Sequence, residues 1–337
     1  MARPRLRALV LAAGRGERLR PLSAELPKPL LPVAGRPLVH FTLEALRAVG
    51  CDAAALNLHH GGAALRAALG ESFRGLPLVY SVEEELLGTG GALPPLAEFL
   101  GAAETVLVLN GDTLCRWPLA RLLADHRRRR AAATLLVSRR AEPREFGGGV
   151  AIERGRVVAF RRGALAWAGA PVHRVFAGAA ALAPELLGRL ASGPADIVAA
   201  LYEPLLAEGA LIAAVETARA WHDLGTPRRY LEGALAAALG GLPPRGRRIA
   251  AGAEVAAGAR VRRAMVESGA RVEAGARVER ALVLAGAVVG AGATVTDAIL
   301  APGVAVAPGA RVAGAMLTRD PEGGANRATP LAPEEGR

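Results

Sequence analysis

The strongest constraint on the fold of this chain is a 17-residue repeat that runs through residues 250–317. Within each repeat the apolar residues are spaced six, five and six apart, and an irregular linker would not keep that register over four periods. Each repeat therefore predicts one structural unit that buries its apolar side only by stacking on its neighbours. The apolar positions are Val255, Val261, Val266, Val272, Val278, Val283, Val289, Val295, Leu300, Val306, Val312 and Leu317, and the glycines form two series with the same period, Gly252, Gly269, Gly286, Gly303 and Gly258, Gly275, Gly292, Gly309.

This spacing resembles that of the hexapeptide-repeat family. The resemblance implies a left-handed parallel β-helix, with three short strands in each coil, one inward apolar side chain per strand and small residues at the corners. Four such coils cover residues 250–317. The Pro, Gly and Glu content of residues 318–337 predicts a disordered tail.

Residues 1–243 are organised differently, because short apolar runs alternate there with helical patterns. This order is typical of α/β proteins and predicts a doubly wound, mostly parallel, Rossmann-like sheet. Ligands of such sheets bind beyond the carboxyl ends of the strands, so residues 13–20 and 110–112 are the first candidates for a site. The predicted strands are Leu6–Ala12, Ala53–Leu58, Leu78–Val82, Thr105–Leu109, Thr134–Val137 and Leu211–Val215, and the predicted helices are Leu38–Val49, Leu119–Arg128 and Arg228–Leu239.

Composition narrows the range of partners and compartments. The net charge of +11 suggests an anionic partner, but an aromatic content of 4% argues against a wide stacking platform for nucleic acid. The longest uncharged stretches are interrupted by glycine and too short to span a bilayer, and the apolar run 8–13 reads as a strand, not a signal peptide. Two cysteines cannot form a disulfide framework or a four-thiolate zinc site. We expect a cytoplasmic protein that binds neither nucleic acid nor a membrane.

Lys28 is the only lysine in a chain that has 42 lysine and arginine residues. Pro27 and Pro29 flank it and restrict the loop, which lowers the entropy cost of presenting its ammonium group. A solvated loop cation is the alternative interpretation. In a chain that otherwise uses arginine, the lone lysine favours a specific need for a compact ammonium group.

A glycine-rich loop follows the first predicted strand and contains Gly14, Gly16 and Arg18. Glycines there let backbone N–H groups turn toward an anion, although an ordinary turn has the same appearance. The loop lacks the Gly-Lys-Ser/Thr of a Walker loop, and Leu19 occupies the place of the third glycine of a dinucleotide fingerprint.

Together with the segment from Pro21 to Leu38, this loop resembles the nucleotidyltransferases that make nucleotide sugars. The resemblance implies that Arg18 neutralises the leaving pyrophosphate and that Lys28 contacts phosphate oxygens during transfer. It is reinforced by the sequence Leu-Gly-Thr-Gly-Gly-Ala at 87–92, which is similar to the family's Leu-Gly-Thr-Ala-Gly-Ala segment beside the base and ribose. The implied nucleotide-binding residues are Leu11, Ala12, Ala13, Gly14, Gly16, Gly88, Thr89, Gly90 and Gly91.

Two aspartates are candidates for binding Mg²⁺. Asp112 ends the sequence Asn-Gly-Asp just after a predicted strand, where a carboxylate would lie at the carboxyl edge of the sheet, although Asn-Gly-Asp also occurs as a plain turn. Asp223 lies in a Trp-His-Asp-Leu-Gly-Thr-Pro segment that resembles the family's second metal-ligand motif. The adjacent His222 is expected to be structural, since Mg²⁺ prefers oxygen ligands.

The sugar-binding region matches the family less well. The implied sugar-phosphate residues are Gly147, Arg161 and Gly178. Phe-Arg-Arg-Gly at 160–163 stands where the family often has Glu-Lys-Pro, and Val-Phe-Ala-Gly at 175–178 replaces a common Asn-Ala-Gly version. These departures leave the identity of the sugar open.

The resemblance implies an enzyme that joins a nucleoside triphosphate to a sugar 1-phosphate and releases pyrophosphate. GTP with mannose 1-phosphate is the favoured pair, and uridylyl or thymidylyl transfer to glucose or amino-sugar 1-phosphates is the alternative. A non-catalytic regulatory subunit is a further possibility, against which the intact Arg18, Lys28, Asp112 and Asp223 argue. An acyltransferase activity of the β-helix would need a histidine base, and no histidine follows His222. We also expect a homo-oligomer assembled through the β-helix, whose ends need covering.

Overall fold

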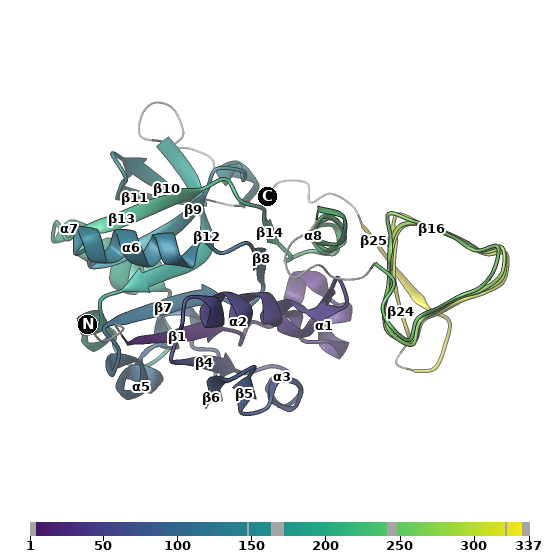
Figure 1. The fold of residues 1–337 in the computed structure, drawn as a ribbon, viewed down its shortest axis with the longest axis horizontal. Helices are drawn as coiled ribbons and strands as arrows, with labels where there is room; N and C mark the ends of the chain where they lie inside the picture. Colours follow the sequence, from purple (N-terminus) through teal and green to yellow (C-terminus); the bar gives the residue numbers. More distant parts are fainter. Residues whose placement is uncertain (1–4, 147, 163–171, 241–247, 321, 332–337) are drawn as a thin grey trace. The chain divides into compact units, whose positions relative to one another are not determined.

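The computed structural model describes residues 5–146, 148–162, 172–240, 248–320 and 322–331 (Figure 1). Their contacts separate two compact units. The expected linear boundary between residues 243 and 250 differs from this division, because two short N-terminal segments and the last helix group with the repeats. The first unit comprises Met1–Arg15, Pro27–Pro29 and Val39–Trp221, and the second comprises Gly16–Leu26, Leu30–Leu38 and His222–Arg337.

The first unit is built on a ten-stranded sheet with the strand order β10-β11-β13-β9-β12-β7-β1-β4-β6-β5. Its strands are β1 (Leu6–Leu11), β4 (Ala53–Leu58), β5 (Ser72–Phe73), β6 (Leu76–Val82), β7 (Thr105–Asn110), β9 (Ala133–Ser138), β10 (Gly148–Glu153), β11 (Arg156–Arg162), β12 (Val172–Leu182) and β13 (Ile212–Thr217), with β8 (Thr113–Cys115) outside this sheet. Its helices are α2 (Leu38–Ala48), α3 (Gly62–Leu69), α4 (Gly88–Gly91), α5 (Ala97–Gly101), α6 (Leu119–Arg129) and α7 (Glu203–Ala207). All six predicted strands and both predicted helices of this unit are present, with ends that differ by at most two residues.

The sheet is mixed, which corrects the prediction of a mostly parallel one. Strands β1, β4, β6 and β7 are parallel neighbours, but β12 runs antiparallel between β7 and β9. Strands β10 and β11 form an antiparallel hairpin. Its two turn residues, Arg154 and Gly155, have φ values of 48° and 73°, the left-handed conformation that a tight hairpin turn requires. The Arg-Gly pair is a weak turn signal, and so the hairpin was not predicted.

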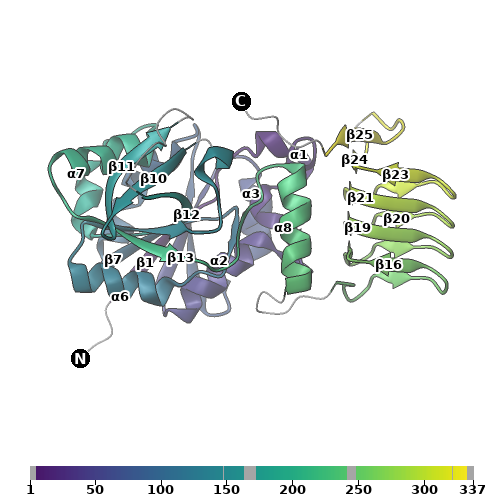
Figure 2. The same ribbon diagram turned by 90° about the horizontal axis from the view of Figure 1, so that it is seen from above.

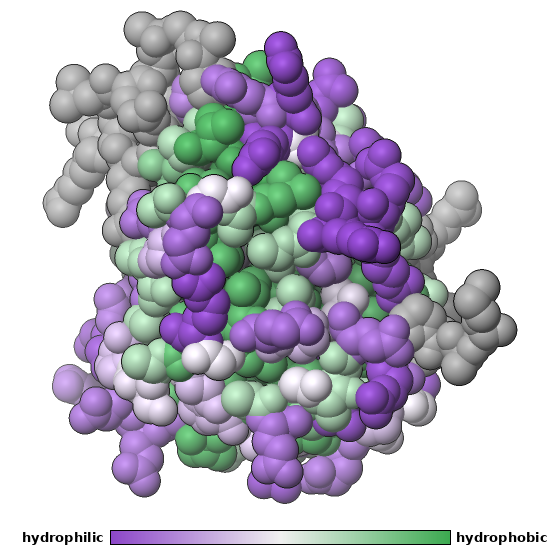
Figure 3. Space-filling view, turned by 90° about the vertical axis from the view of Figure 1, so that its left-hand side faces the viewer, coloured by the Kyte–Doolittle hydropathy of each residue, from purple (hydrophilic) through white to green (hydrophobic). Residues whose placement is uncertain are grey.

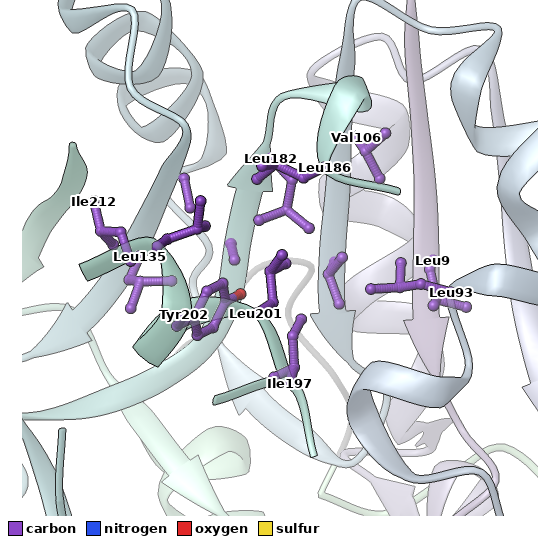
Figure 4. Packing of buried hydrophobic residues seen from close by; sticks show 14 of the residues in the cluster. Leu9, Leu93, Val106, Leu135, Leu182, Leu186, Ile197, Leu201, Tyr202 and Ile212 are labelled. Carbon is purple, nitrogen blue, oxygen red and sulfur yellow. The ribbon is translucent and has the colours of Figure 1, made fainter. Parts of the chain in front are cut away.

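One face of the sheet buries alternate residues of the strands against short helical segments (Figure 4). Leu9, Val106 and Leu135 point from the sheet into this cluster. They pack with Leu93, next to α4, and with Leu201, in a π-helical turn at Val198–Tyr202. Burial of this apolar surface is the main stabilising contribution to the unit.

The opposite face of the sheet is covered by α6, which contacts β9, β12 and β13. His126 of α6 is 6% exposed, and its Nδ1 lies 2.9 Å from Oγ1 of Thr134. Burial and the neighbouring Arg127 lower the pKa of His126 below its ordinary value, so the ring is neutral at pH 7. This histidine therefore has a packing role.

The second unit contains a parallel β-helix, as the repeat predicted. Successive coils pair in register at intervals of 17 residues, for example through Val261, Val278, Val295 and Val312. The coils superimpose as a triangle in Figure 1 and stack as rungs in Figure 2. The β-helix strands are β15 (Glu254–Val255), β16 (Arg260–Arg262), β17 (Met265–Val266), β18 (Arg271–Val272), β19 (Arg277–Val283), β20 (Val288–Val289), β21 (Thr294–Leu300), β22 (Ala305–Val306), β23 (Arg311–Ala313) and β24 (Ala315–Thr318).

The corners of the coils explain the two glycine series. All eight repeat glycines have positive φ values between 67° and 83°, a conformation that is unfavourable for residues with a Cβ atom. The third corner also has positive φ but is formed by Arg263, Arg280, Asp297 and Gly314. Nε of Arg280 donates to Oδ1 of Asp297 at 2.7 Å, so an ion pair links two successive coils there.

The chain beyond Thr318 is not wholly disordered, which corrects the prediction for this segment. Residues Arg327–Pro330 form β25, which pairs antiparallel with β24 of the last coil. Leu331, which follows, is 1% exposed. The physical reason is the open strand edge of the last coil, whose unpaired backbone groups β25 satisfies.

The remaining elements of the second unit pack together beside the coils. They are α1 (Leu22–Glu25), a hairpin of β2 (Pro32–Val33) and β3 (Arg36–Pro37), and α8 (Pro227–Gly240), which contacts β2, β19 and β21; β14 (Trp221–Asp223) precedes α8. Tyr230 of α8 is fully buried and donates its hydroxyl hydrogen to the carbonyl oxygen of Pro32 at 2.9 Å. Close to it, the amide of Gly35 donates to Oε1 of Glu267 at 3.2 Å.

Hydrophilic and apolar side chains lie beside each other on the face of the molecule shown in Figure 3. Within the part of the chain that the structure describes, no helix is both long and apolar enough to cross a membrane.

Glu267 gives a test of the packing in the second unit. Its side chain is buried, and burial raises its pKa above the ordinary value while the Gly35 hydrogen bond lowers it in part. The folded state therefore holds the proton more tightly than the unfolded state, and stability falls as the pH rises from the ordinary pKa through the raised one. We predict that Glu267→Gln stabilises the protein at pH 8 by on the order of 1 kcal/mol, because glutamine stays neutral and still accepts from Gly35.

The measurement is thermal unfolding followed by circular dichroism at pH 4.5 and pH 8. The gain should be large at pH 8 and small at pH 4.5, because that pH is near the ordinary pKa of glutamate and little stability has yet been lost to ionisation there. Glu254→Gln, an exposed position of the same β-helix, is the control and should change little at either pH. An equal gain at both pH values would contradict this explanation.

Candidate active site

The predicted Lys28 and Asp112 form an ion pair in the first unit. Nζ of Lys28 donates to Oδ2 of Asp112 at 2.6 Å. Lys28 is 8% exposed, whereas the Asp112 side chain is 36% exposed. An ammonium is costly to bury without a counter-charge, and Asp112 supplies that counter-charge. The lone lysine is thus a buried, fixed cation, and the interpretation as a solvated loop residue is wrong.

Asp112 reaches this position because its turn folds back against the first strand. The amide of Gly111 donates to the carbonyl oxygen of Leu11 at 2.9 Å. A Cβ atom at residue 111 would lie 2.9 Å from that same oxygen, closer than real side chains come. Glycine at 111 therefore lets the end of β7 approach the end of β1 and places the carboxylate at the carboxyl edge of the sheet.

The predicted nucleotide loop begins at the end of β1. The amide of Ala12 donates to Oδ1 of Asn57 at 2.8 Å. Ala12 and Ala13 are buried, whereas a Cβ atom placed on Gly14 would meet no protein atom within 4 Å. Packing does not require glycine at 14, and the absence of a side chain keeps the adjoining space open.

The second unit holds the other part of the loop together with Asp223. Gly16 has a φ of 63° and accepts a hydrogen bond from Oγ of Ser23 at 2.7 Å. Oδ2 of Asp223 lies 3.0 Å from an Nη atom of Arg229 and 4.0 Å from an Nη atom of Arg18. The Arg18 side chain is 60% exposed, so its guanidinium is accessible to an anion.

A Cβ atom on either of two glycines would crowd the side chain of Asp223 or His222. A Cβ atom on Gly225 would lie 2.8 Å from Arg18 and 3.0 Å from Asp223. A Cβ atom on Gly233 of α8 would lie 3.1 Å from the His222 side chain. His222 therefore packs closely against α8, in agreement with a structural role.

The predicted Gly88–Gly91 segment, which is α4, packs closely on residues 193–197. The amides of Gly90 and Gly91 both donate to the carbonyl oxygen of Ala195, at 2.8 and 3.3 Å. A Cβ atom on Gly91 would lie 2.1 Å from the carbonyl oxygen of Gly193. The protein itself engages these two amides, and the contact of this segment with a nucleotide stays a prediction. The small residues are explained by the close packing, and Thr89 adds a contact by accepting from the amide of Ile197 at 2.9 Å.

The structure describes the backbone of two of the three predicted sugar-phosphate residues. Gly147 lies outside the described residues, and Arg161 lies in β11, where it pairs with Gly149. Gly178 has a φ of 81°, and a Cβ atom there would lie 3.2 Å from the Asn110 side chain. Gly178 sits at the irregularity in the pairing of β12 with β9, which brings its backbone close to the end of β7.

An aromatic pair lies beside this strand. Nε1 of Trp221 donates to the carbonyl oxygen of Ala177 at 3.0 Å. The rings of Trp221 and Phe146 meet edge to face with centroids 5.0 Å apart. The two rings hold the segment before Gly147 against β12.

The oxygen donors present fit a divalent metal of the Mg²⁺ type. The described residues contain no cluster of three or more His, Cys, Asp or Glu side chains of the kind that holds a metal by protein ligands alone. Mg²⁺ is usually bound by only one or two carboxylates, with water and substrate phosphates completing its shell. Asp112 in the first unit and Asp223 in the second each carry a carboxylate of this kind.

Cys115 lies three residues after Asp112 but is unsuited to chemistry. Burial raises its pKa to about 12, so the side chain is a neutral thiol at pH 7. A nucleophilic role for this cysteine is therefore excluded.

Three polar residues with evident structural importance were missed in the sequence. Arg229 pairs with Asp223, and Asn57 and Glu83 join in a buried hydrogen bond of 2.8 Å. The available signal was Asn57, a polar residue near the end of an otherwise apolar strand. Buried polar groups need partners, so such a residue predicts a hydrogen-bond network.

Comparison with known families agrees with this arrangement. Residues 7–161 match the family model described as nucleotidyl transferase. Residues 247–325 match the model described as GlmU-like, C-terminal hexapeptide. The two matches fall on the two differently organised parts of the sequence.

The curated relatives are mannose-1-phosphate guanylyltransferases. The protein of that name from Mycobacterium tuberculosis is 36% identical over 236 residues, which span 69% of this chain and 65% of the relative. A probable mannose-1-phosphate guanylyltransferase 2 from Arabidopsis thaliana is 32% identical over 236 residues, 68% of this chain and 64% of the relative. The matched part thus spans slightly less than two thirds of these relatives.

Solved structures share the fold at lower identity. A putative glucose-1-phosphate thymidylyltransferase from Bacillus anthracis has a TM-score of 0.61 at 18% identity and covers 69% of this chain and 95% of its own. HddC from Yersinia pseudotuberculosis has a TM-score of 0.57 at 19% identity, and the match covers 68% of this chain and 97% of HddC.

Proposed function

We propose that this protein is a sugar-1-phosphate nucleotidyltransferase, which transfers a nucleotidyl group from a nucleoside triphosphate to a sugar 1-phosphate. The observation that carries the proposal is the buried Lys28 ammonium, held 2.6 Å from Asp112 beside the open Gly14 loop. A fixed cation, together with a loop that lacks a side chain at Gly14, fits a ligand with several phosphates. The guanylyltransferase relatives and the nucleotidyl transferase domain support the same reaction.

In the proposed reaction, an oxygen of the sugar phosphate attacks the α-phosphorus of the triphosphate. The bond from the α-phosphorus to the bridging oxygen breaks, and the electron pair leaves with pyrophosphate. Because two polyanions must meet, catalysis depends on positioning and on positive charge. Lys28 is assigned to the reacting phosphates and the exposed Arg18 to the pyrophosphate.

The proposal assigns Asp112 and Asp223 as ligands of Mg²⁺, which when bound would neutralise charge on the phosphates. Asp112 also orients Lys28, and Arg229 fixes the carboxylate of Asp223. The backbone from Leu11 to Gly14, with Gly16, is assigned to the nucleotide, and so is the segment Gly88–Gly91. Gly178 is assigned to the sugar phosphate, together with Arg161 and Gly147.

GTP and mannose 1-phosphate are the proposed substrates, because the curated relatives carry the name mannose-1-phosphate guanylyltransferase. Uridylyl or thymidylyl transfer to glucose or amino-sugar 1-phosphate is the second candidate, in keeping with the thymidylyltransferase name of a protein that shares the fold. The test is pyrophosphate release over a grid of five nucleoside triphosphates and several sugar 1-phosphates with Mg²⁺. Turnover with one pair supports the proposal, and no turnover with any pair would favour a regulatory subunit.

We predict that Asp112→Asn and Asp223→Asn each lower turnover at least 100-fold, roughly 2.7 kcal/mol, while the fold is retained. Each change removes a charged oxygen ligand and barely alters volume. The measurement is initial rate as a function of Mg²⁺ concentration. Asp125→Asn on α6 is the control, since the Asp125 and Asp223 side chains have the same exposed fraction of 17%. Wild-type rates at limiting Mg²⁺ would rule out the substituted residue as a ligand.

We predict that Lys28→Arg lowers the rate at least tenfold, about 1.4 kcal/mol. A planar guanidinium is wider than an ammonium and cannot occupy the same buried position 2.6 Å from Asp112 without displacing its surroundings. Steady-state kinetics measure the effect. Arg66→Lys, at an exposed ion pair with Glu71, is the matched control and should retain wild-type rates. Unchanged kinetics in Lys28→Arg would show that the lone lysine is a compositional accident.

We also propose that the β-helix is left-handed, as the hexapeptide match suggests, and that the protein is a homo-oligomer assembled through it. The support is the first coil, where Val255 and Val261 are only partly buried and Ile249 is 43% exposed, whereas Val278 of the next coil is 1% exposed. Apolar surface of this kind favours contact with a second copy.

We predict that Val261→Glu lowers the molar mass in solution, because it places a charge on this apolar end. Light scattering at micromolar concentration makes the measurement. Arg260→Glu, an exposed neighbour in the same coil, controls for the added charge and should leave the mass unchanged. A wild-type protein that is already monomeric would contradict the assembly proposal.

A further inference from the structure

The carboxyl ends of three parallel strands lie side by side in the first unit. Leu11, the last residue of β1, pairs with Asn57 of β4, and Leu58 of β4 pairs with Val82 at the end of β6. The register therefore brings Ala12, Asn57 and Glu83 to the same edge of the sheet.

These three residues belong to a continuous chain of hydrogen bonds. The amide of Ala12 donates to Oδ1 of Asn57 at 2.8 Å, and Nδ2 of Asn57 donates to Oε1 of Glu83 at 2.8 Å. Oε2 of Glu83 accepts from the amide of Leu87 at 3.0 Å. Asn57 is 3% exposed and Glu83 is 4% exposed. The first two links are thus shielded from water and the third is partly shielded. Hydrogen bonds act more strongly away from water, and missing partners are costly there.

This series of hydrogen bonds begins and ends at two segments to which the proposed function assigns the nucleotide. Ala12 opens the loop that contains Gly14, and Leu87 immediately precedes Gly88. The carboxylate is held in place by its own backbone as well, because the amide of Glu83 donates to the carbonyl oxygen of Leu58 at 2.7 Å. Nδ1 of His59 also lies 3.0 Å from the carbonyl oxygen of Glu83.

We propose that Asn57 and Glu83 are positioning residues that hold the two nucleotide-binding segments at a fixed separation. They act through the backbone amides of Ala12 and Leu87, without touching the substrate. The inference rests on the proposed function, since it explains how the nucleotide site is kept in one geometry before the ligand arrives. A site held in this way binds more tightly, because less ordering is left to occur on binding.

The direction of each hydrogen bond in this series explains why residue 57 is asparagine and residue 83 is glutamate, and it supplies the test. Two backbone donors face inward at its ends, so the side chains between them must provide three acceptors and one donor. Asn57 gives one acceptor and one donor, and the two oxygens of Glu83 give two acceptors. In Glu83→Gln a second donor is added, and one donor must face another whichever way the two amides turn. In Asn57→Asp two acceptors oppose each other instead.

The double variant Asn57→Asp, Glu83→Gln restores every hydrogen bond. Aspartate at 57 then accepts from Ala12 and from the new amide at 83, while the amide oxygen at 83 accepts from Leu87. Shape and total charge are the same as in the wild type. The double variant should therefore recover what each single variant loses, which is a double-mutant cycle between two residues in contact.

The experiment measures the dissociation constant of GTP with Mg²⁺ by calorimetry, and kcat and KM for GTP at saturating mannose 1-phosphate. If another nucleotide gives the highest turnover in the substrate grid, that nucleotide replaces GTP. We expect each single variant to raise the dissociation constant and KM for the nucleotide at least tenfold with kcat changed less than threefold. The double variant should return to within threefold of the wild type. Glu84→Gln, the exposed neighbour of Glu83, is the matched control.

The readouts separate positioning from general stability. A merely structural role would lower the folded fraction, and hence kcat, while KM for the nucleotide stayed unchanged. Single variants with wild-type nucleotide affinity, or a folded double variant without recovery, overturn this proposal alone. A wild-type protein that neither binds nor turns over any nucleoside triphosphate overturns the proposed function as well. If the single variants do not fold, the double variant decides, since native affinity supports the network and weakened affinity contradicts it.

Discussion

The position of strand β1 determines where the candidate residues at the neighbouring strand ends lie. Parallel strands flank it on both sides, and Leu11 at its end is opposite Asn57 of β4 and Asn110 of β7. This register brings three strand ends to one edge of the sheet, so the loops that follow them are neighbours although they are distant in sequence. The hydrogen bond between Ala12 and Asn57 and the turn that carries Asp112 are both consequences of this arrangement.

The side chains at this edge show how a buried charge is accommodated. Lys28 is almost fully enclosed, and its charge is balanced by one carboxylate at hydrogen-bonding distance. Glu83 is equally enclosed, and its two oxygens each accept a hydrogen bond. In both cases the cost of removing a charge from water is offset by fixed partners, and the geometry becomes rigid as a result. Rigidity of this kind suits a reaction that depends on positioning.

Much of this organisation could be predicted from the sequence because it depends on local periodicity. The apolar runs at β1, β4 and β7 were predicted to within two residues, and the isolated lysine signalled a special position. Strand β12 was missed because its pairing partners lie far away in sequence and its residues give no alternation that marks it. The Asn57–Glu83 bond joins side chains 26 residues apart, and no local pattern specifies such a contact. The role of Gly91 likewise depends on Gly193, which only the folded chain brings near.

The repeats of the β-helix have a consequence for how this part of the chain can change in length. Each coil pairs with the next at an interval of 17 residues, and the corner glycines and inward valines recur at the same interval. An insertion or deletion of one whole repeat would leave every remaining column of side chains intact, whereas a change of any other size would place polar residues in the interior. The last coil is the exception, since its edge is paired with β25. Gain and loss of coils should therefore occur in whole units before that cap, through duplication or recombination between repeats.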